Sequence, residues 1–236
     1  MEALGPAYVL HGRPYRDTSA LVDLLTLHQG LVRVVWRGAR GRRSLAQPFV
    51  PLLIGLRGRG ELRTLGQAEI AGPYGLLQGQ ALFSGLYLNE LLVRLLPPGE
   101  PQTLVFAAYQ QALAQLAAAR PVEPVLRAFE WQLMDNLGYG FTPDTDGAGA
   151  PINPDARYVY TADAGLCRNE DSQQTGFSGA VLRAIAARDW DYPGALAAAK
   201  RLMRQALAPH LGDRPLVSRQ LFSRPGPGPR EETDHE

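Results

Sequence analysis

The sequence predicts an α+β protein in which a small β-barrel precedes a helical region. Three observations lead to this fold class. Short apolar runs separated by turn residues fill roughly the first 70 positions, leucines at helical spacing follow, and the net charge changes sign between the two parts. The chain has 236 residues, which suits one large domain or two small ones.

Five short strands are expected before any helix: Ala7–Leu10, Ser19–Leu27, Leu31–Trp36, Phe49–Leu56 and Glu61–Ile70. The connection His28-Gln29-Gly30 is a hairpin signal, because glycine adopts the left-handed conformation that such turns need. Five strands without intervening helices favour a closed or partly open barrel. A three-stranded sheet with loose flanks is the alternative.

The pattern changes after Gly72-Pro73. Leucines 88, 91, 92 and 95 fall on one face of a helix that ends at Pro97-Pro98. Further helices are expected at Thr103–Ala119, from Leu126 to a stop at Gly138, at Ser178–Arg188 and at Gly194–Ala208. The expected organisation is therefore a barrel domain at 1–75, a helical domain at 76–222 and a disordered tail at 223–236.

A segment rich in Gly, Pro, Asp and Asn interrupts the helical domain at about 140–177. It is expected to be a small irregular insertion, with one weak strand at Arg157–Thr161. Its only cysteine, Cys167, is also the only one in the chain, which excludes an internal disulfide and a cysteine-rich zinc site. No metal and no cofactor are expected.

Catalytic motifs are not found. The sequence has no G-x-S-x-G, Walker A or H-E-x-x-H pattern, and its carboxylates are dispersed. No apolar run reaches the length of a membrane span, and no signal peptide is recognisable. We therefore expect a cytoplasmic protein that is not an enzyme and has no membrane partner.

The charge distribution indicates a nucleic-acid-binding part. Residues 1–80 carry a net charge of +5, and the remainder carries −4. Arg37 to Arg43 form a glycine-containing basic loop, and guanidinium groups bind phosphate oxygens or stack on bases. An ordinary solvated loop is the alternative. The candidate DNA-binding residues are Arg13, Arg16, Arg33, Arg37, Arg40, Arg42, Arg43, Arg57 and Arg59.

Two basic features lie in the helical part. Lys200, Arg201 and Arg204 share one expected helix and are candidates for a DNA or partner contact, or form a solvated face. Arg127 follows Leu126 and lies close to Phe129. A cation beside an apolar pocket is what a short acidic peptide with a hydrophobic end needs for binding.

The chain resembles the RecO family of recombination mediators. The similarity runs from about residue 7 to 222, and the pieces occur in the family's order and spacing. They are Ala7-Tyr-Val-Leu-His-Gly-Arg-Pro-Tyr-Arg-Asp-Thr-Ser19, Val35-Trp-Arg-Gly-Ala-Arg40, Gln47-Pro-Phe-Val-Pro-Leu52, Gly85-Leu-Tyr-Leu-Asn-Glu-Leu-Leu92, Leu126-Arg-Ala-Phe-Glu130, Leu137-Gly-Tyr-Gly140, Ala199-Lys-Arg201 and Pro215-Leu-Val-Ser-Arg219.

The resemblance implies an OB-fold, a helical domain with an insertion, and binding of single- and double-stranded DNA with strand annealing. It also implies contact with RecR, binding of the acidic tail of single-stranded-DNA-binding protein, and indirect help in loading RecA. Arg127 matches the family position associated with that tail, and Leu126 and Phe129 accompany it. Some family members carry a cysteine zinc site in the insertion; Cys167 alone cannot form one.

Two other functions stay open on the residues alone. One is a general OB-fold nucleic-acid-binding module without mediator activity. The other is a nuclease, which would need a cluster of metal-binding carboxylates that the sequence does not show.

Overall fold

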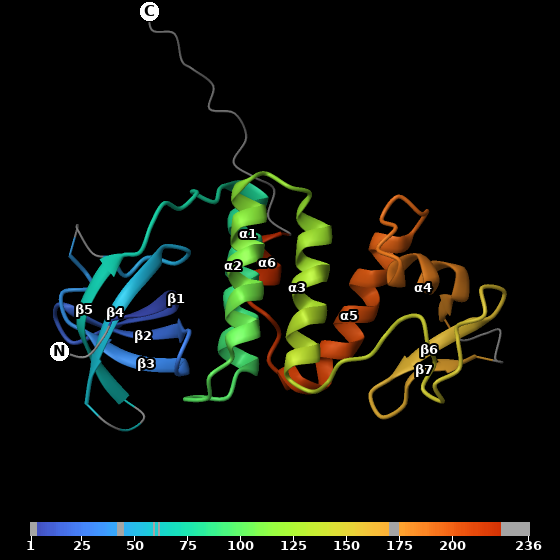
Figure 1. Ribbon diagram of the computed structural model, residues 1–236, viewed down its shortest axis with the longest axis horizontal. Helices are drawn as coiled ribbons and strands as arrows, with labels where there is room; N and C mark the ends of the chain where they lie inside the picture. The colour runs from blue at the N-terminus through green and yellow to red at the C-terminus, as the bar shows by residue number, and fades with distance from the viewer. Residues whose placement is uncertain (1–3, 42–44, 59, 61, 170–174, 223–236) are drawn as a thin grey trace, which may run out of the picture.

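The computed structural model describes residues 4–41, 45–58, 60, 62–169 and 175–222. The molecule is elongated. The barrel lies at one end, a layer of helices at the centre, and a small sheet with a short helix at the other end (Figure 1). Functional groups carried by the barrel and by the helices can therefore face different partners.

The barrel contains five strands: β1 (Gly5–Tyr15), β2 (Ser19–Thr26), β3 (Gly30–Trp36), β4 (Pro51–Arg57) and β5 (Leu62–Ile70). It is closed in the order β1-β2-β3-β5-β4. The β3–β5 pair is parallel and the other pairs are antiparallel. This is the topology of an OB-fold, so the predicted five-stranded barrel is confirmed and the three-stranded alternative is wrong.

Strand β1 is longer than expected because it continues past a bulge between Val9 and His11. Its residues after the bulge are polar or small and mostly exposed, so no apolar pattern marks them. Before the bulge its side chains alternate between two apolar environments. Val9 packs inside the barrel, whereas Tyr8 and Leu10 pack against the helices.

The hairpin between β2 and β3 fixes the barrel against the helical part. Gly30 has a φ of +62°, as the sequence predicts for this turn, and a Cβ there would lie 1.7 Å from the carbonyl oxygen of Glu100. The backbone N–H of Gly99 donates to the carbonyl of Leu31. Deeper in the junction, Asn89 donates to the carbonyl of Leu10 and accepts from the buried Tyr109 hydroxyl.

The central layer consists of α1 (Gly79–Leu95), α2 (Thr103–Ala117) and α3 (Val122–Asn136), with α5 (Ala195–Leu211) beside α3 (Figure 1). Leu88, Leu91 and Leu92 on α1 are fully buried, as their spacing predicts. They join residues of α2, α3 and α5 in one apolar core that also reaches the outer face of β1 to β3. Barrel and helices thus share a continuous core.

The insertion is more regular than expected. It forms a three-stranded sheet of β6 (Arg157–Thr161), β7 (Gly165–Arg168) and β8 (Phe177–Ser178), and α4 (Gly179–Ala186) follows. Of the three strands, the sequence predicted only β6, whose aromatic and β-branched run Tyr158-Val159-Tyr160 is typical of a strand. Tyr158, Leu166 and Phe177 pack with α4 and α5 in an apolar core of their own, which holds the described part of the insertion together.

The last described element is α6 (Ser218–Leu221), a short helix that packs on α1 and was not expected from the sequence. The tail predicted at 223–236 lies outside the described residues.

Candidate functional site

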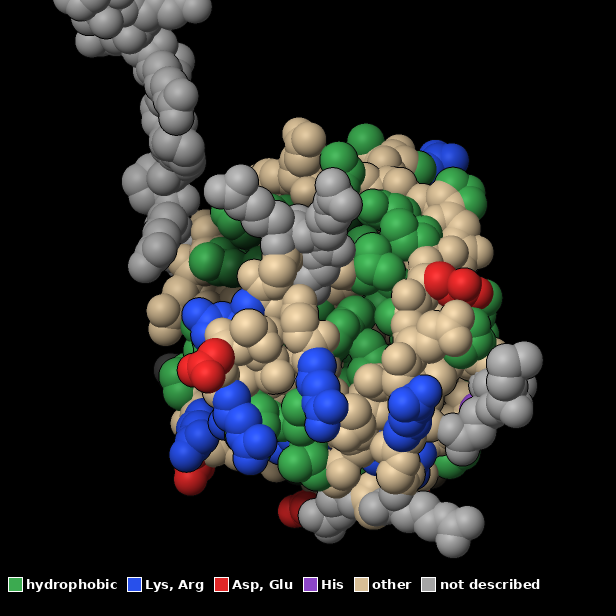
Figure 2. Space-filling model, turned by 90° about the vertical axis from the view of Figure 1, so that its left-hand side faces the viewer, with side chains coloured by type: hydrophobic (Ala, Val, Ile, Leu, Met, Phe, Trp, Pro, Cys, Tyr) green, Lys and Arg blue, Asp and Glu red, His purple; other side chains and the backbone are tan. Residues whose placement is uncertain are grey.

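The barrel presents one strongly basic face. Figure 2 looks at the barrel end of the molecule and shows Lys and Arg side chains gathered over the lower half of this face, with few acidic side chains among them. Arg13, Arg16, Arg37 and Arg57 make no ion pair with any described residue. Four unneutralised guanidinium groups on a small barrel are well suited to contact a phosphate backbone.

Two of these arginines share a groove of about 540 Å³. Arg37 follows β3, Arg57 ends β4, and both line the groove together with Trp36. The Arg57 side chain lies over Gly66, where a Cβ would approach its Nε to 3.0 Å. The groove therefore combines two cations with an aromatic ring, although Trp36 is largely buried in the barrel core.

Arg16 and Arg40 bring two basic loops together. Arg16 has a φ of +54°, and its guanidinium lies 5.1 Å from the ring centre of Tyr15. Arg40 donates to the backbone carbonyls of Asp17 at 3.0 Å and Arg16 at 3.4 Å. These bonds hold the loop after β3 against the turn between β1 and β2 and leave the charge of Arg40 unneutralised.

Arg33 differs from the other predicted DNA contacts. Its Nε donates to the buried Asp23 carboxylate at 2.6 Å. This hydrogen bond and the charge of Asp23 raise the pKa of Arg33. His11 lies 3.8 Å from the same carboxylate. Because Asp23 neutralises it, Arg33 contributes less to the field of this face than its position in the sequence suggests.

Three predicted contacts, Arg42, Arg43 and Arg59, lie outside the described residues. Arg63 was not among the predicted contacts but lies on the same barrel, where it bonds Gln29 and lines two cavities. The sequence signal for Arg63 was its place in Glu61–Ile70, the segment in which apolar and polar residues alternate as in a strand.

A second site lies among the helices. A cavity of about 910 Å³ is bounded by α1, α3, α5 and α6 and by the segment before α5. Four cations line it, Arg127 from α3, Lys200 and Arg204 from α5, and Arg219 from α6. Apolar side chains line the rest, among them Leu126, Val122, Leu196, Trp190 and Phe222. The structure thus brings together two basic features that are more than 70 residues apart in the sequence.

Arg127 is held by a buried network. Its Nη2 donates to Glu130 Oε1 at 2.7 Å, and the hydroxyl of Tyr87 donates to the same oxygen at 2.6 Å. Burial raises the pKa of Glu130, and the neighbouring Arg127 and Tyr87 counteract it. Arg127 Nε and Glu130 Oε2 are buried and have no hydrogen-bond partner among the described residues. Arg127 therefore keeps a donor without a partner at the wall of a basic cavity.

Not every predicted residue lines this cavity. Phe129 is buried on another side of α3, where its ring packs edge-on against Tyr109. Arg201 points to the insertion: it donates to the carbonyl of Gly176 at 2.8 Å and stacks over the ring of Phe177 at 4.2 Å. Its neighbour Lys200 faces the cavity and pairs with Glu123 at 3.6 Å.

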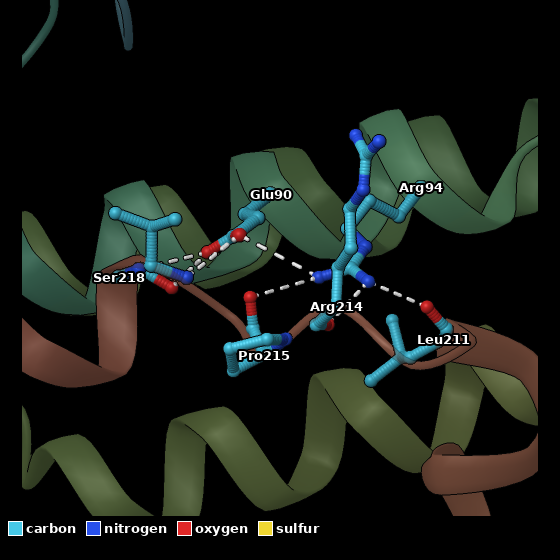
Figure 3. Close-up of polar contacts among 7 residues, drawn as sticks. Glu90, Arg94, Leu211, Arg214, Pro215 and Ser218 are labelled. Atoms are coloured by element: carbon cyan, nitrogen blue, oxygen red, sulfur yellow. Dashed lines mark hydrogen bonds and ion pairs between the residues drawn. The ribbon is translucent and has the colours of Figure 1, made fainter.

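The segment before α6 is fastened to α1 by two charged side chains (Figure 3). Glu90 accepts from the backbone N–H groups of Val217 and Ser218 and from the Ser218 hydroxyl. Arg94 donates to the carbonyls of Leu211, Arg214 and Pro215. This clamp places Arg219 and Phe222 at the cavity, a contribution that helical periodicity could not reveal.

Among the described residues, no group of three or more His, Cys, Asp or Glu side chains is placed to hold a metal ion. Within the same ranges, no helix is both long and apolar enough to cross a membrane.

Comparison with known proteins decides the family. The model of the family "Recombination protein O N terminal" matches residues 1–74, and that of "Recombination protein O C terminal" matches residues 76–220. The chain belongs to the RecO family. Curated relatives named DNA repair protein RecO include one from Pseudomonas paraeruginosa strain PA7, 59% identical over 95% of this chain and 96% of its own length. One from Stutzerimonas stutzeri strain A1501 is 57% identical over 96% of each chain.

Membership of the RecO family confirms the resemblance seen in the sequence and identifies a DNA repair protein. A relative from Pseudomonas putida strain W619, also named DNA repair protein RecO, is 57% identical over 92% of this chain. The junction between the two family models coincides with the passage from the barrel to α1.

Proposed function

We propose that the protein is a recombination mediator with two working surfaces. The barrel face binds single- and double-stranded DNA and supports strand annealing. The cavity between α1, α3, α5 and α6 receives the acidic tail of single-stranded-DNA-binding protein. With RecR as a further partner, the protein helps RecA to load onto coated single strands. We assign it no catalytic step, and we place it in the bacterial cytoplasm in association with the nucleoid.

Binding of DNA to the barrel is supported by arginines whose charges are not neutralised by any described carboxylate. Arg13, Arg16, Arg37 and Arg57 have no carboxylate partner among the described side chains, and Arg40 donates to two backbone carbonyls and makes no ion pair with those side chains. Contacts of this kind recognise the backbone rather than the sequence, and their affinity falls with salt as counterions are released. Such contacts suit a protein that acts on any strand.

The observation that carries the mediator assignment is Arg127 in its cavity. A buried guanidinium with a free Nε donor, three further cations and an apolar wall form a complementary site for an acidic peptide with a hydrophobic end. Tail carboxylates would approach Lys200, Arg204 and Arg219, and the apolar end would enter between Leu126 and Trp190. Phe129, which is buried elsewhere, would support α3 without touching the peptide.

The test is binding of a fluorescent tail peptide, measured by anisotropy at low salt. Replacing Arg127 with Ala should weaken binding at least about tenfold, since it removes one member of a buried charge pair. Because this change also leaves Glu130 unpaired, Arg204→Ala is the second variant, with an expected loss of about threefold. Arg183→Ala, on the exposed side of α4, is the control. Unchanged affinity in both cavity variants would refute the assignment.

A further inference from the structure

The chain continues from the rim of the cavity into a segment whose sequence ends in a cluster of acids. Phe222 lines the cavity and is the last described residue, and the segment 223–236 (SRPGPGPREETDHE) continues from it. Four acids occupy the distal part of the segment, at 231, 232, 234 and 236, whereas its two arginines, 224 and 230, come earlier. Opposite charges therefore lie at the cavity and on the segment attached to its rim.

We propose that residues 223–236 occupy the basic part of this cavity and compete with the acidic tail peptide, an inference that rests on the peptide site proposed above. The cavity is lined by four cations and two acids, Glu123 and Asp191. The intramolecular segment supplies carboxylates for Lys200, Arg204 and Arg219. Its only apolar side chains after Phe222 are three prolines that precede the acids, so the acidic part leaves the apolar part of the cavity unfilled.

The connection is long enough for this contact. Eight residues lie between Phe222 and Glu231, and the nine Cα–Cα steps of an extended chain span up to about 30 Å. The starting point is fixed, because Glu90 and Arg94 clamp residues 211–218 to α1. The cavity wall is thus within reach without any movement of the described helices.

The cavity also has groups ready to accept carboxylates. In the described part of the chain, Lys200 has one ionic partner, Glu123 at 3.6 Å, and both side chains are about half exposed, so an incoming carboxylate would replace a weak surface pair. Arg204 lines the cavity and makes no ion pair with the described residues. Arg127 Nε is buried and has no hydrogen-bond partner in the same ranges.

The competition should be moderate in size. A short connection gives an effective concentration of about 1 mM. If the isolated segment binds with a Kd of about 0.1 to 0.5 mM, it lowers the apparent affinity of an external peptide by about three- to tenfold. The external peptide also has an apolar end, and burial of this end in the cavity adds to its affinity and allows it to displace the segment.

The experiment uses three full-length proteins, one of them also with Arg204→Ala, and two peptide probes, with a single-stranded oligonucleotide for comparison. The proteins are the wild type, a neutralised form (Glu231→Gln, Glu232→Gln, Asp234→Asn, Glu236→Gln) and a control form (Arg224→Gln, Arg230→Gln). The first probe is the labelled tail peptide of single-stranded-DNA-binding protein. The second is a labelled peptide with the sequence of residues 223–236, titrated into the neutralised protein with and without Arg204→Ala.

We expect the neutralised protein to bind the first probe about three- to tenfold more tightly than the wild type, and the control form to bind it no more tightly. The second probe should bind the neutralised protein with a sub-millimolar Kd and lose affinity with Arg204→Ala. Equal affinity of wild type and neutralised protein for the first probe would overturn the competition and leave the proposed function intact.

The other outcomes are equally decisive. Binding of the second probe without any binding of the first would support the intramolecular contact and refute the proposed peptide site. Failure of both probes would refute both. If neutralisation raises affinity for a single-stranded oligonucleotide but not for the first probe, the acids oppose the barrel and the competition is overturned.

Discussion

The guanidinium of Arg127 and the carboxylate of Glu130 form an ion pair of 2.7 Å in which the two residues are 5% and 1% exposed. A buried pair of this kind contributes little to stability, because the free energy needed to remove both charges from water can exceed the attraction between them. Within the described residues, the pair still leaves one donor and one acceptor without partners. This arrangement is consistent with the proposed peptide site, in which the free donor would bind an anion.

The first prediction concerns the pH dependence of stability. Because burial raises the pKa of Glu130 above its unfolded value, the native state binds more protons than the unfolded state between those two values. Stability therefore falls as pH rises through that window. Glu130→Gln removes this titration, so the free energy of unfolding of wild type minus variant should decrease with pH. Urea denaturation from pH 4 to 8 measures it, and a difference that rises with pH would contradict the prediction.

The second prediction separates two neighbouring cations on α5. Lys200→Ala should weaken binding of the acidic peptide by about two- to fivefold and leave stability within about 0.5 kcal/mol, since its pair with Glu123 is exposed. Arg201→Ala should leave peptide affinity unchanged and lower the free energy of unfolding by about 1–2 kcal/mol, because it loses its contacts to Gly176 and Phe177.

Each variant is the control for the other in peptide titrations and thermal denaturation. Equal effects of Lys200→Ala and Arg201→Ala on peptide affinity would show that α5 acts only through its total charge.

The third prediction concerns the barrel groove. Replacing Arg37 and Arg57 with Ala should weaken binding of a single-stranded oligonucleotide and reduce the slope of log K against log salt by up to about 0.7 per arginine. The same measurement on Arg40, Arg42 and Arg43 tests the loop after β3. Arg183→Ala, on α4 at the other end of the molecule, is the control for the loss of one positive charge away from the barrel. An unchanged slope in the groove variant would show that these arginines are only solvated.

The sequence alone predicted the barrel well, because some of its strands are apolar on both faces and others are joined by a recognisable turn. Val9 and Tyr8 both lie in cores, and Gly30 marks the hairpin. The end of β1 was missed because exposed residues pair there without an apolar pattern. β7 and β8 were missed because strands of four and two residues carry too few alternations to be recognised.

The candidate site was predicted only in part. Arg127 came from its apolar neighbours and from the family resemblance, and Lys200 and Arg204 from helical spacing. Nothing in the sequence shows that α3 and α5 line the same cavity. The sequence also does not show that the bond between Glu90 and Ser218 places Arg219 at that cavity. Charge counts also could not reveal that Asp23 neutralises Arg33 or that Arg201 is engaged with Gly176.

In the proposed function, DNA and the acidic tail use different surfaces of one molecule. The decisive measurement is annealing of complementary strands, bare and coated with single-stranded-DNA-binding protein. The wild type should anneal both. Arg204→Ala and Arg127→Ala should anneal bare strands at the wild-type rate and coated strands about three- to tenfold more slowly. If these variants anneal coated strands as fast as the wild type, or lose activity equally on bare strands, the two-surface account is contradicted.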